Sequence, residues 1–326
     1  QNTNSNALVK KYYGKETNIL YRQTLSLKYT GAWDNGVTTN NYVQFEKTRN
    51  TRLSEGLSGG IAGIFSPSNE GFSTITLYDT NLHSEVNIPF DAWVNQTLTL
   101  GAEYNHQAMR DPSSNTESTS SGGSVIGISD TNRSLYSSAD IYGVYAEDNI
   151  ELTDTTRLTP GLRFNHQSIS GSNWSPALNL SQELGDDFTL KLGVARAWKA
   201  PNLYQTNPNC LLFSKGQGCY SAGSGYCYLQ GNSDLKAETS VNKEIGIEYH
   251  HNDVQAGLTW YRNDYHDKIE GGYNPEYKNG TADVYKWENV PKAVVQGLEG
   301  TLNFPITDSL KMNNNFTYII DNENKS

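Results

Sequence analysis

Strict alternation of polar and apolar residues marks the stretch Gln96-Thr97-Leu98-Thr99-Leu100-Gly101-Ala102-Glu103-Tyr104. From Leu98 to Tyr104, every second residue is apolar or aromatic, which indicates a β-strand with one apolar and one wet face. The same alternation recurs in residues 157–164, 188–194 and 254–261. A soluble β-sandwich also alternates, but here the runs are long and very long loops lie between some of them. The sequence therefore predicts an all-β fold, a transmembrane antiparallel β-barrel with a wet lumen.

Composition supports this fold class. The chain has 326 residues, a formal charge of −10 and a mean hydropathy of −0.64. No apolar run is long enough for a spanning helix, whereas only half of each barrel strand has to be apolar. The 21 tyrosines suit aromatic girdles at the membrane interfaces, and ordinary strand propensity is the alternative. The negative charge argues against a nucleic-acid partner, and any anionic ligand would need a local basic patch.

The connections between alternating segments fall into two classes. Short polar turns are expected at 34–36, 91–95, 153–156, 185–187, 251–253 and 307–309. Long loops rich in Gly, Ser, Asn and Pro are expected at about 49–78, 107–137, 202–240 and 267–293. In outer-membrane barrels, short turns face the periplasm and long loops face outside. We therefore expect residues 1–326 to form part of a barrel, with roughly twelve strands. Short and long connections should alternate strictly along the chain.

The cysteines and histidines give no sign of a metal centre. Cys219 and Cys227 are close together among Gly and Ser, which favours a disulfide-closed loop in an oxidising compartment. A zinc site is the weaker alternative, because no histidine lies near them, and Cys210 is left without an assigned role. None of the six histidines has ligand spacing with a carboxylate or cysteine, so we predict no protein-ligated metal.

No catalytic motif is present either. The sequence contains no Gly-x-Ser-x-Gly, phosphate-binding loop or His-Glu-x-x-His pattern, so we expect no enzyme. Several glutamates take the parity of the wet face, and in barrels such residues bind water, one another or a plug. They are Glu103, Glu151, Glu244, Glu248 and Glu299.

Several motifs resemble those of TonB-dependent receptors. Residues 197–205, Ala-Trp-Lys-Ala-Pro-Asn-Leu-Tyr-Gln, look like the lysine-alanine-proline signature of these barrels, and 235–246 resemble the segment after the next long loop. More specifically, the chain resembles ferric enterobactin (catecholate siderophore) receptors over nearly its whole length. The stretches that carry this likeness are 31–39, 48–52, 173–180, 214–220 and 287–300.

The resemblance implies a segment of a 22-stranded barrel in the outer membrane of a Gram-negative bacterium. It also implies an N-terminal plug and import driven by TonB. The chain starts without Met and departs from the family pattern, because the plug, the TonB-contacting box, the early strands and the C-terminal strands are missing. We therefore expect it to be a piece of a longer receptor.

The implied ligand is a ferric catecholate, a compact trianion with aromatic faces, which needs cations and aromatic rings in an external loop. Arg49 and Arg52, with Lys47 nearby, match the basic loop motif of the family. Arginine suits this ligand because it offers planar donors and stacking as well as charge. The alternative is that both arginines pair with Glu46 and Glu55, or contact lipopolysaccharide phosphates.

Further candidates lie in another loop. Lys215 and Gln217 form a glycine-flanked tip before Cys219, and immobilisation by the disulfide would reduce the entropy lost on binding. A solvated turn is the alternative for this tip. Five tyrosines are candidate stacking faces, and for any one of them girdle or loop packing is the favoured interpretation: Tyr42, Tyr204, Tyr220, Tyr226 and Tyr228.

These observations predict a receptor that captures a ferric catecholate siderophore in its outer loops and imports it. The expected partners are the ferric siderophore, TonB and outer-membrane lipid or lipopolysaccharide, and no covalently bound cofactor is expected. The alternative is a docking or adhesion barrel that recognises a macromolecule such as a colicin or phage. A secreted β-rich glycosidase is a third possibility, which would require two spaced catalytic carboxylates.

Overall fold

The computed structural model describes residues 14–16, 18–53, 72–112, 134–214, 227–279 and 282–325. The helical elements in these ranges are a 3-10 helix, η1 (Asp34–Gly36), and one turn of α-helix, α2 (Leu203–Thr206). No helix in the described ranges is both long and apolar enough to span a membrane. The strands are β1 (Asn18–Ala32), β2 (Thr38–Leu53), β3 (Phe72–Asp91), β4 (Asn95–Arg110), β5 (Tyr136–Thr153), β6 (Thr156–Gln167), β7 (Gly171–Leu184), β8 (Phe188–Lys199), β9 (Leu211–Ser214), β10 (Cys227–Gln230), β11 (Glu238–His251), β12 (Val254–Gly271), β13 (Tyr277–Asn279), β14 (Ala282–Thr307) and β15 (Leu310–Lys325).

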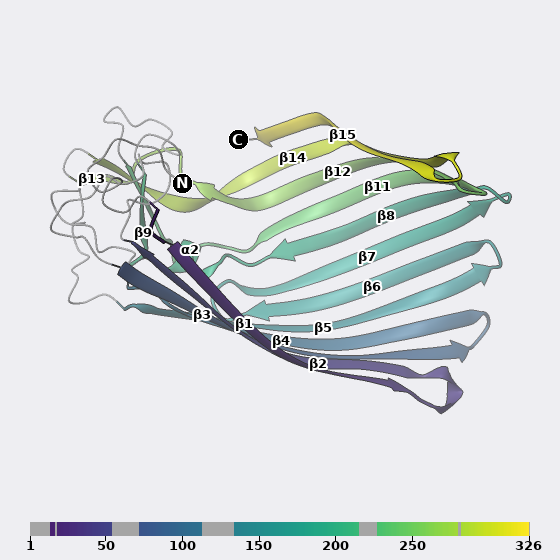
Figure 1. Ribbon diagram of the computed structural model, residues 1–326, viewed down its shortest axis with the longest axis horizontal. Coiled ribbons are helices and arrows are strands. Elements are labelled where there is room, and N and C mark those ends of the chain that lie inside the picture. Colours follow the sequence, from purple (N-terminus) through teal and green to yellow (C-terminus); the bar gives the residue numbers. More distant parts are fainter. Residues whose placement is uncertain are drawn as a thin grey trace.

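The long strands form one curved wall, seen from the side in Figure 1. The order is β1 to β8, then β11, β12, β14 and β15, with antiparallel neighbours throughout. Among the described residues the sheet has 15 strands, and all except β9, β10 and β13 belong to this wall. The roughly twelve strands expected for the barrel are thereby confirmed.

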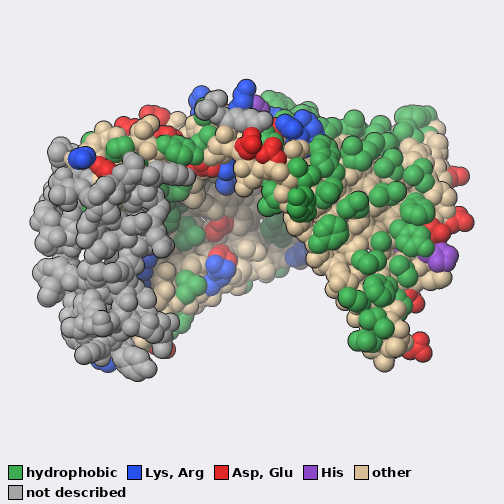
Figure 2. All heavy atoms as spheres, turned by 90° about the horizontal axis from the view of Figure 1, so that it is seen from above, with side chains coloured by type: hydrophobic (Ala, Val, Ile, Leu, Met, Phe, Trp, Pro, Cys, Tyr) green, Lys and Arg blue, Asp and Glu red, His purple; other side chains and the backbone are tan. Residues whose placement is uncertain are grey.

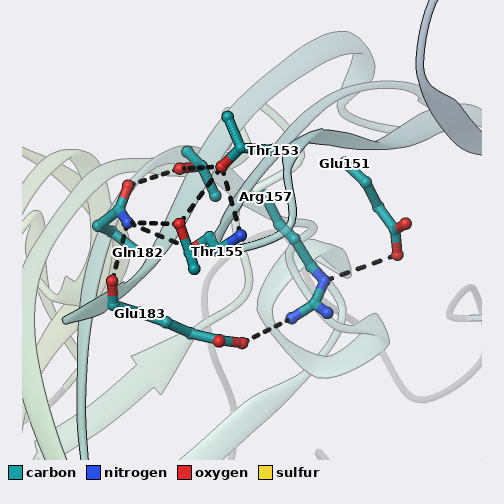
Figure 3. Close-up of polar contacts among 7 residues, drawn as sticks. Glu151, Thr153, Thr155, Arg157, Gln182 and Glu183 are labelled. Atoms are coloured by element: carbon teal, nitrogen blue, oxygen red, sulfur yellow. Dashed lines mark hydrogen bonds and ion pairs between the residues drawn. The ribbon is translucent and has the colours of Figure 1, made fainter. Parts of the chain in front are cut away.

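The predicted short turns all join neighbouring strands at one end of the wall (Figure 1). In the first, Asn35 and Gly36 adopt positive φ angles of 69° and 75°. Asn and Gly adopt this left-handed conformation more readily than other residues do. Figure 3 shows the β5–β6 turn, where Thr153 Oγ1 contacts Thr156 Oγ1 at 2.9 Å and Thr156 donates to Gln182 at 2.6 Å. Side-chain hydroxyls thus close the turn in place of water.

The connections at the opposite end differ from prediction in two ways. Residues 168–170 join β6 to β7 in a tight turn that ends at Gly171, whose φ is 84°, so the strict order of short and long connections is wrong at this point. The strands also run further into the predicted loops, because β2 continues to Leu53 and β14 begins at Ala282. Cross-strand hydrogen bonding extends the ladder where the polar composition indicates a loop.

The register sorts the alternating residues onto two faces. Val86, Leu100, Ala146, Leu162 and Pro176 are cross-strand neighbours from β3 to β7. They are not packed inside a globule, since Leu100 is 39 % exposed and Leu162 is 46 % exposed. Figure 2 shows hydrophobic side chains over the outer surface of the wall, around a hollow that contains acidic and basic groups. The partition into a lipid-facing and a lumen face is confirmed.

Candidate ligand-binding mouth

A small apolar cluster lies where the lumen faces of β3, β4 and β5 reach the long-loop end of the wall. Met109, Ala139 and Leu203 are buried there, and Ile75, Leu77 and Tyr204 pack against them. Ile75 and Leu77 on β3, Met109 on β4 and Ala139 on β5 have lumen-facing parity, so the cluster covers the inner side of the rim. We call this end of the barrel the mouth.

The helix α2 brings Tyr204 to this cluster. Asn202 accepts a hydrogen bond from the backbone of Gln205 at 2.9 Å, and the Gln205 side chain accepts one from the backbone of Asn202 at 2.9 Å, a reciprocal capping box. Two bonds tie the helix to the wall: Gln167 donates to the carbonyl of Pro201 at 3.2 Å, and Asn207 donates to Ser137 at 2.8 Å. The segment after the lysine-alanine-proline signature is therefore held in place.

Tyr204 and Arg52, both singled out from the sequence, lie at the mouth, where the charge of Arg52 acts on the Tyr204 phenol. Burial raises the pKa of the Tyr204 phenol, Asp111 and Cys210 raise it further, and the positive charge of Arg52 opposes the shift. The phenol therefore stays protonated at neutral pH and can donate a hydrogen bond. A cation and an aromatic ring lie close enough to interact electrostatically.

Arg49 and Arg52 do not share a face of β2. Arg52 lies opposite Ser73, on the lumen side, whereas Arg49 lies opposite Thr76 and Tyr21, on the outer side. The guanidinium of Arg49 lies 5.5 Å from the centre of the Tyr21 ring. Within the described part of the chain, Arg52 has no ion-pair partner, so its charge is available to a ligand.

A second, smaller sheet joins two of the long connections at the mouth. It consists of β9, β10, the first residues of β14 and β13, and we call it the loop sheet. β10 pairs with β14 in parallel, from Cys227 opposite Asp283 to Gln230 opposite Lys286. Val284 is 0 % exposed, and Tyr228 and Tyr285 are also buried, so the loop sheet has a core of its own.

Asparagines strengthen the link between these connections. Asn289 donates to the carbonyls of Lys236 and Asp267, at 3.0 and 2.7 Å, and accepts from the Lys236 backbone at 2.9 Å. Asn232 donates to the carbonyl of Trp287 at 2.9 Å. A single side chain thus bridges three segments, and the two connections are held as one unit on the wall.

The glycine-flanked tip lies outside the described residues. Lys215, Gln217, Cys219 and Tyr220 all belong to it, and their roles stay predictions. Cys227, at the start of β10, is disulfide-bonded, as expected for one partner of the predicted bridge. Cys210 is buried close to Tyr204.

Tyr42 lies near the short-turn end of β2, on the lumen face, well away from the mouth. It stacks on His83 with ring centres 4.8 Å apart. His83 Nδ1 lies 3.2 Å from Glu103, and Arg163 binds the other oxygen of Glu103. Tyr42 is thus part of a lumen network, and its role as a stacking face for a ligand stays a prediction.

The other glutamates named from parity also lie on the lumen face of their strands. Glu248 forms an ion pair with Lys191 at 2.7 Å, and Glu151 lies 3.8 Å from Arg157. Figure 3 shows Arg157 between Glu151 and Glu183 near the short-turn end. Glu151 and Glu248 thus bind the barrel's own cations. In the described ranges, no three His, Cys, Asp or Glu residues gather to hold a metal ion.

Sequence reasoning missed the residues that shape the mouth. Met109 and Asp111 carried no motif, and Asn289 lay in the family-like stretch 287–300 but was given no role there. All three fell in segments expected to be loops. The parity of Met109 would have placed it on the lumen face if the strand had been extended to Arg110.

Comparisons with known proteins agree with this architecture. Residues 1–326 match the family model described as TonB dependent receptor-like, beta-barrel. The chain is 59 % identical over 331 residues to the ferrienterobactin receptor of Escherichia coli, covering 100 % of this chain and 44 % of that protein. It is 56 % identical over 334 residues to the ferric enterobactin receptor of Pseudomonas aeruginosa, again covering 100 % of this chain and 44 % of the relative.

Solved structures show the same relationship. A crystal structure of the ferric enterobactin receptor PfeA in complex with BCV-L6 superposes with a TM-score of 0.88 at 56 % identity, covering 100 % of this chain and 47 % of that one. A point variant of PfeA from Pseudomonas aeruginosa, in complex with enterobactin, also gives 0.88 and the same coverage. The chain thus spans less than half the length of these relatives.

Proposed function

Because the chain belongs to the TonB-dependent receptor β-barrel family, and so to the outer membrane of a Gram-negative bacterium, we propose that the complete protein captures a ferric catecholate siderophore at the mouth and imports it with energy from TonB. The relatives' names, ferrienterobactin and ferric enterobactin receptor, support enterobactin or a close analogue as the ligand. The protein is accordingly a receptor and transporter and not an enzyme.

One observation carries the assignment of the site: Arg52 and Tyr204, from segments far apart in the sequence, both lie at the lumen side of the mouth, where the positive charge of Arg52 acts on the Tyr204 phenol. A tris-catecholate complex offers three negative charges and flat rings, which a guanidinium can bind through both charge and stacking. The phenol of Tyr204 adds a donor. Arg49 was expected beside Arg52, but its side chain lies on the other face of β2, so we assign the contact to Arg52.

The loop sheet supports the same function. Capture at the mouth is tighter when loops are ordered before the ligand arrives, since less conformational entropy is lost on binding. The bonds of Asn289 and the parallel pairing of β10 with β14 provide such order. Lys215 and Gln217 come between β9 and β10 in the sequence and would supply the remaining charge.

TonB is the partner that the family implies, and the other partners are our proposals. TonB would act through a plug inside the lumen, and the iron would arrive already chelated, so no bound cofactor is required. Lipopolysaccharide would contact the outer face of the wall. Colicins or phages would bind the long loops that also capture the siderophore.

A titration tests the proposal. The complete receptor is titrated with ferric enterobactin, and we expect saturable binding that competes with other ferric catecholates and not with a ferric hydroxamate. Growth of an iron-starved strain on ferric enterobactin as sole iron source separates transport from simple docking. A barrel that only adsorbs colicins or phages would bind those particles but would not support growth.

A further inference from the structure

Three cations lie together on the outer face of the wall near the mouth. Arg49 on β2 and Arg110 on β4 both stand opposite Thr76 on β3, and Lys47 stands opposite Tyr78. Thr76 and Tyr78 share the parity of Leu82 and Val86, so these cations face away from the lumen. We call Lys47, Arg49 and Arg110 the outer basic patch.

The outer basic patch has no acidic partner among the described residues. Its neighbours are aromatic: Arg49 lies over the Tyr21 ring at 5.5 Å and Lys47 over the Tyr78 ring at 5.3 Å. Glu46, a possible partner by sequence, faces the lumen and pairs with Arg22 at 3.2 Å. The uncompensated positive charge is therefore exposed on the outer surface.

The one carboxylate on the outer face of β5 in this region is already engaged. Asp140 accepts a hydrogen bond from Tyr104 at 2.7 Å and lies 2.7 Å from His106 Nδ1. It therefore does not neutralise Arg110, which stands opposite Tyr136 further along the strand. The patch keeps a net positive field, which would attract an anion.

The height of the patch places it at the membrane boundary. On the outer face of β3, Phe90 lies at the short-turn end and Tyr78 about 12 residues away, which is roughly 40 Å along the strand and about 30 Å along a barrel axis tilted by some 40°. The apolar band of such barrels is about 25 Å tall and is bounded by aromatic side chains. Lys47 is level with Tyr78, and Arg49 and Arg110 lie one outer-facing residue higher.

We propose that the outer basic patch binds a phosphate group on the headgroup of a glycolipid in the outer leaflet. Two guanidiniums flanking Thr76 can bind phosphate oxygens with paired donors, and the lysine adds a point charge. The rings of Tyr21 and Tyr78 lie where interfacial aromatics anchor a barrel. This contact is independent of siderophore binding, which occurs on the lumen side.

The test uses the complete receptor in detergent and bisphosphorylated lipid A as the probe. Native mass spectrometry measures lipid binding to the wild type and to the Lys47→Gln/Arg110→Gln variant. We expect the variant to bind about thirty-fold more weakly, since each basic side chain near an anionic lipid contributes about a factor of five. Arg110→Gln alone should weaken binding about five-fold.

Two controls keep the result interpretable. Lys243→Gln/Lys292→Gln removes two other outward cations, one of which pairs with Asp264 at 2.9 Å, and should leave lipid A binding within about two-fold of wild type. Lipid A stripped of its phosphates should bind wild type and variant equally. Equal binding of the two lipid forms to the wild type, or equal losses in both double variants, would overturn the proposal. Heat-modifiable migration on gels establishes that each variant is folded.

Discussion

Replacing Arg52 with Ala is the perturbation that tests the mouth most directly. The side chain faces the lumen at the rim and is half-buried, and its positive charge acts on the Tyr204 phenol. A hydrogen bond to a charged group contributes about 1.5–3 kcal/mol, and partial exposure at the mouth favours the lower part of that range. A loss of about 2 kcal/mol corresponds to roughly thirty-fold weaker binding.

The assay is a fluorescence titration of the complete receptor with ferric enterobactin. Arg49→Ala is the matched control, because it removes the same side chain three residues earlier on the opposite face of β2. We expect its dissociation constant to stay within about three-fold of wild type, as is usual for a surface charge. Arg52→Lys should fall between wild type and Arg52→Ala, since lysine keeps the charge but not the planar donors.

The reasoning is refuted if Arg52→Ala binds as tightly as wild type, or if Arg49→Ala causes the larger loss. The second result would mean that the outer face of β2 contributes to the siderophore site. If both variants lose affinity and also lose heat-modifiable migration, the cause is a folding defect. Arg52→Lys then tests the role of Arg52 in binding, because its affinity should fall between those of wild type and Arg52→Ala.

Four further expectations follow from particular contacts. Leu100→Arg, on the lipid-facing side, should destabilise the barrel in a bilayer by about 2–4 kcal/mol in urea unfolding, whereas Thr99→Arg on the lumen face should cost far less. Gly101→Ala should reduce the yield of folded barrel, because a Cβ there would overlap the Tyr145 ring. Gly161→Ala, whose Cβ would have its nearest neighbour at 3.7 Å, should be tolerated. Asn289→Ala removes three hydrogen bonds and should increase hydrogen exchange in residues 227–237 without affecting β3 to β5, and unchanged exchange would show that the loop sheet does not depend on it. The pKa of Tyr204 is raised above the ordinary value of 10 in the folded protein. The protonated phenol therefore contributes its full stability below pH 10, and this contribution decreases as the pH rises towards the folded pKa. In unfolding curves measured over a pH series, Tyr204→Phe should lose less stability above pH 10 than the wild type does.

The wall could be derived from the sequence because it depends on local periodicity. Leu98, Leu100, Ala102 and Tyr104 alternate with polar residues, and a strand must place such residues on opposite faces wherever it pairs. The short turns followed in the same way from their Asn, Asp and Gly content, and the motifs at 197–205 and 287–300 indicated the family.

The mouth depends on features that alternation does not encode. The segments around Arg49 and Asn289 were expected to be loops because polar residues interrupt the pattern, yet neighbouring strands supply hydrogen bonds that extend β2 and β14 through them. Once β2 continues to Leu53, residues 49 and 52 must face opposite ways, because three is an odd number of strand positions.

The sequence by itself therefore determined which residues meet lipid and which meet water, since that choice repeats every two residues along a single strand. Tertiary structure alone decided that Tyr204 and Arg52 share the mouth, and that β10 pairs in parallel with β14. Both arrangements bring together segments far apart in the chain, and their geometry is set by how the wall curves and where its strands end, which no local pattern specifies.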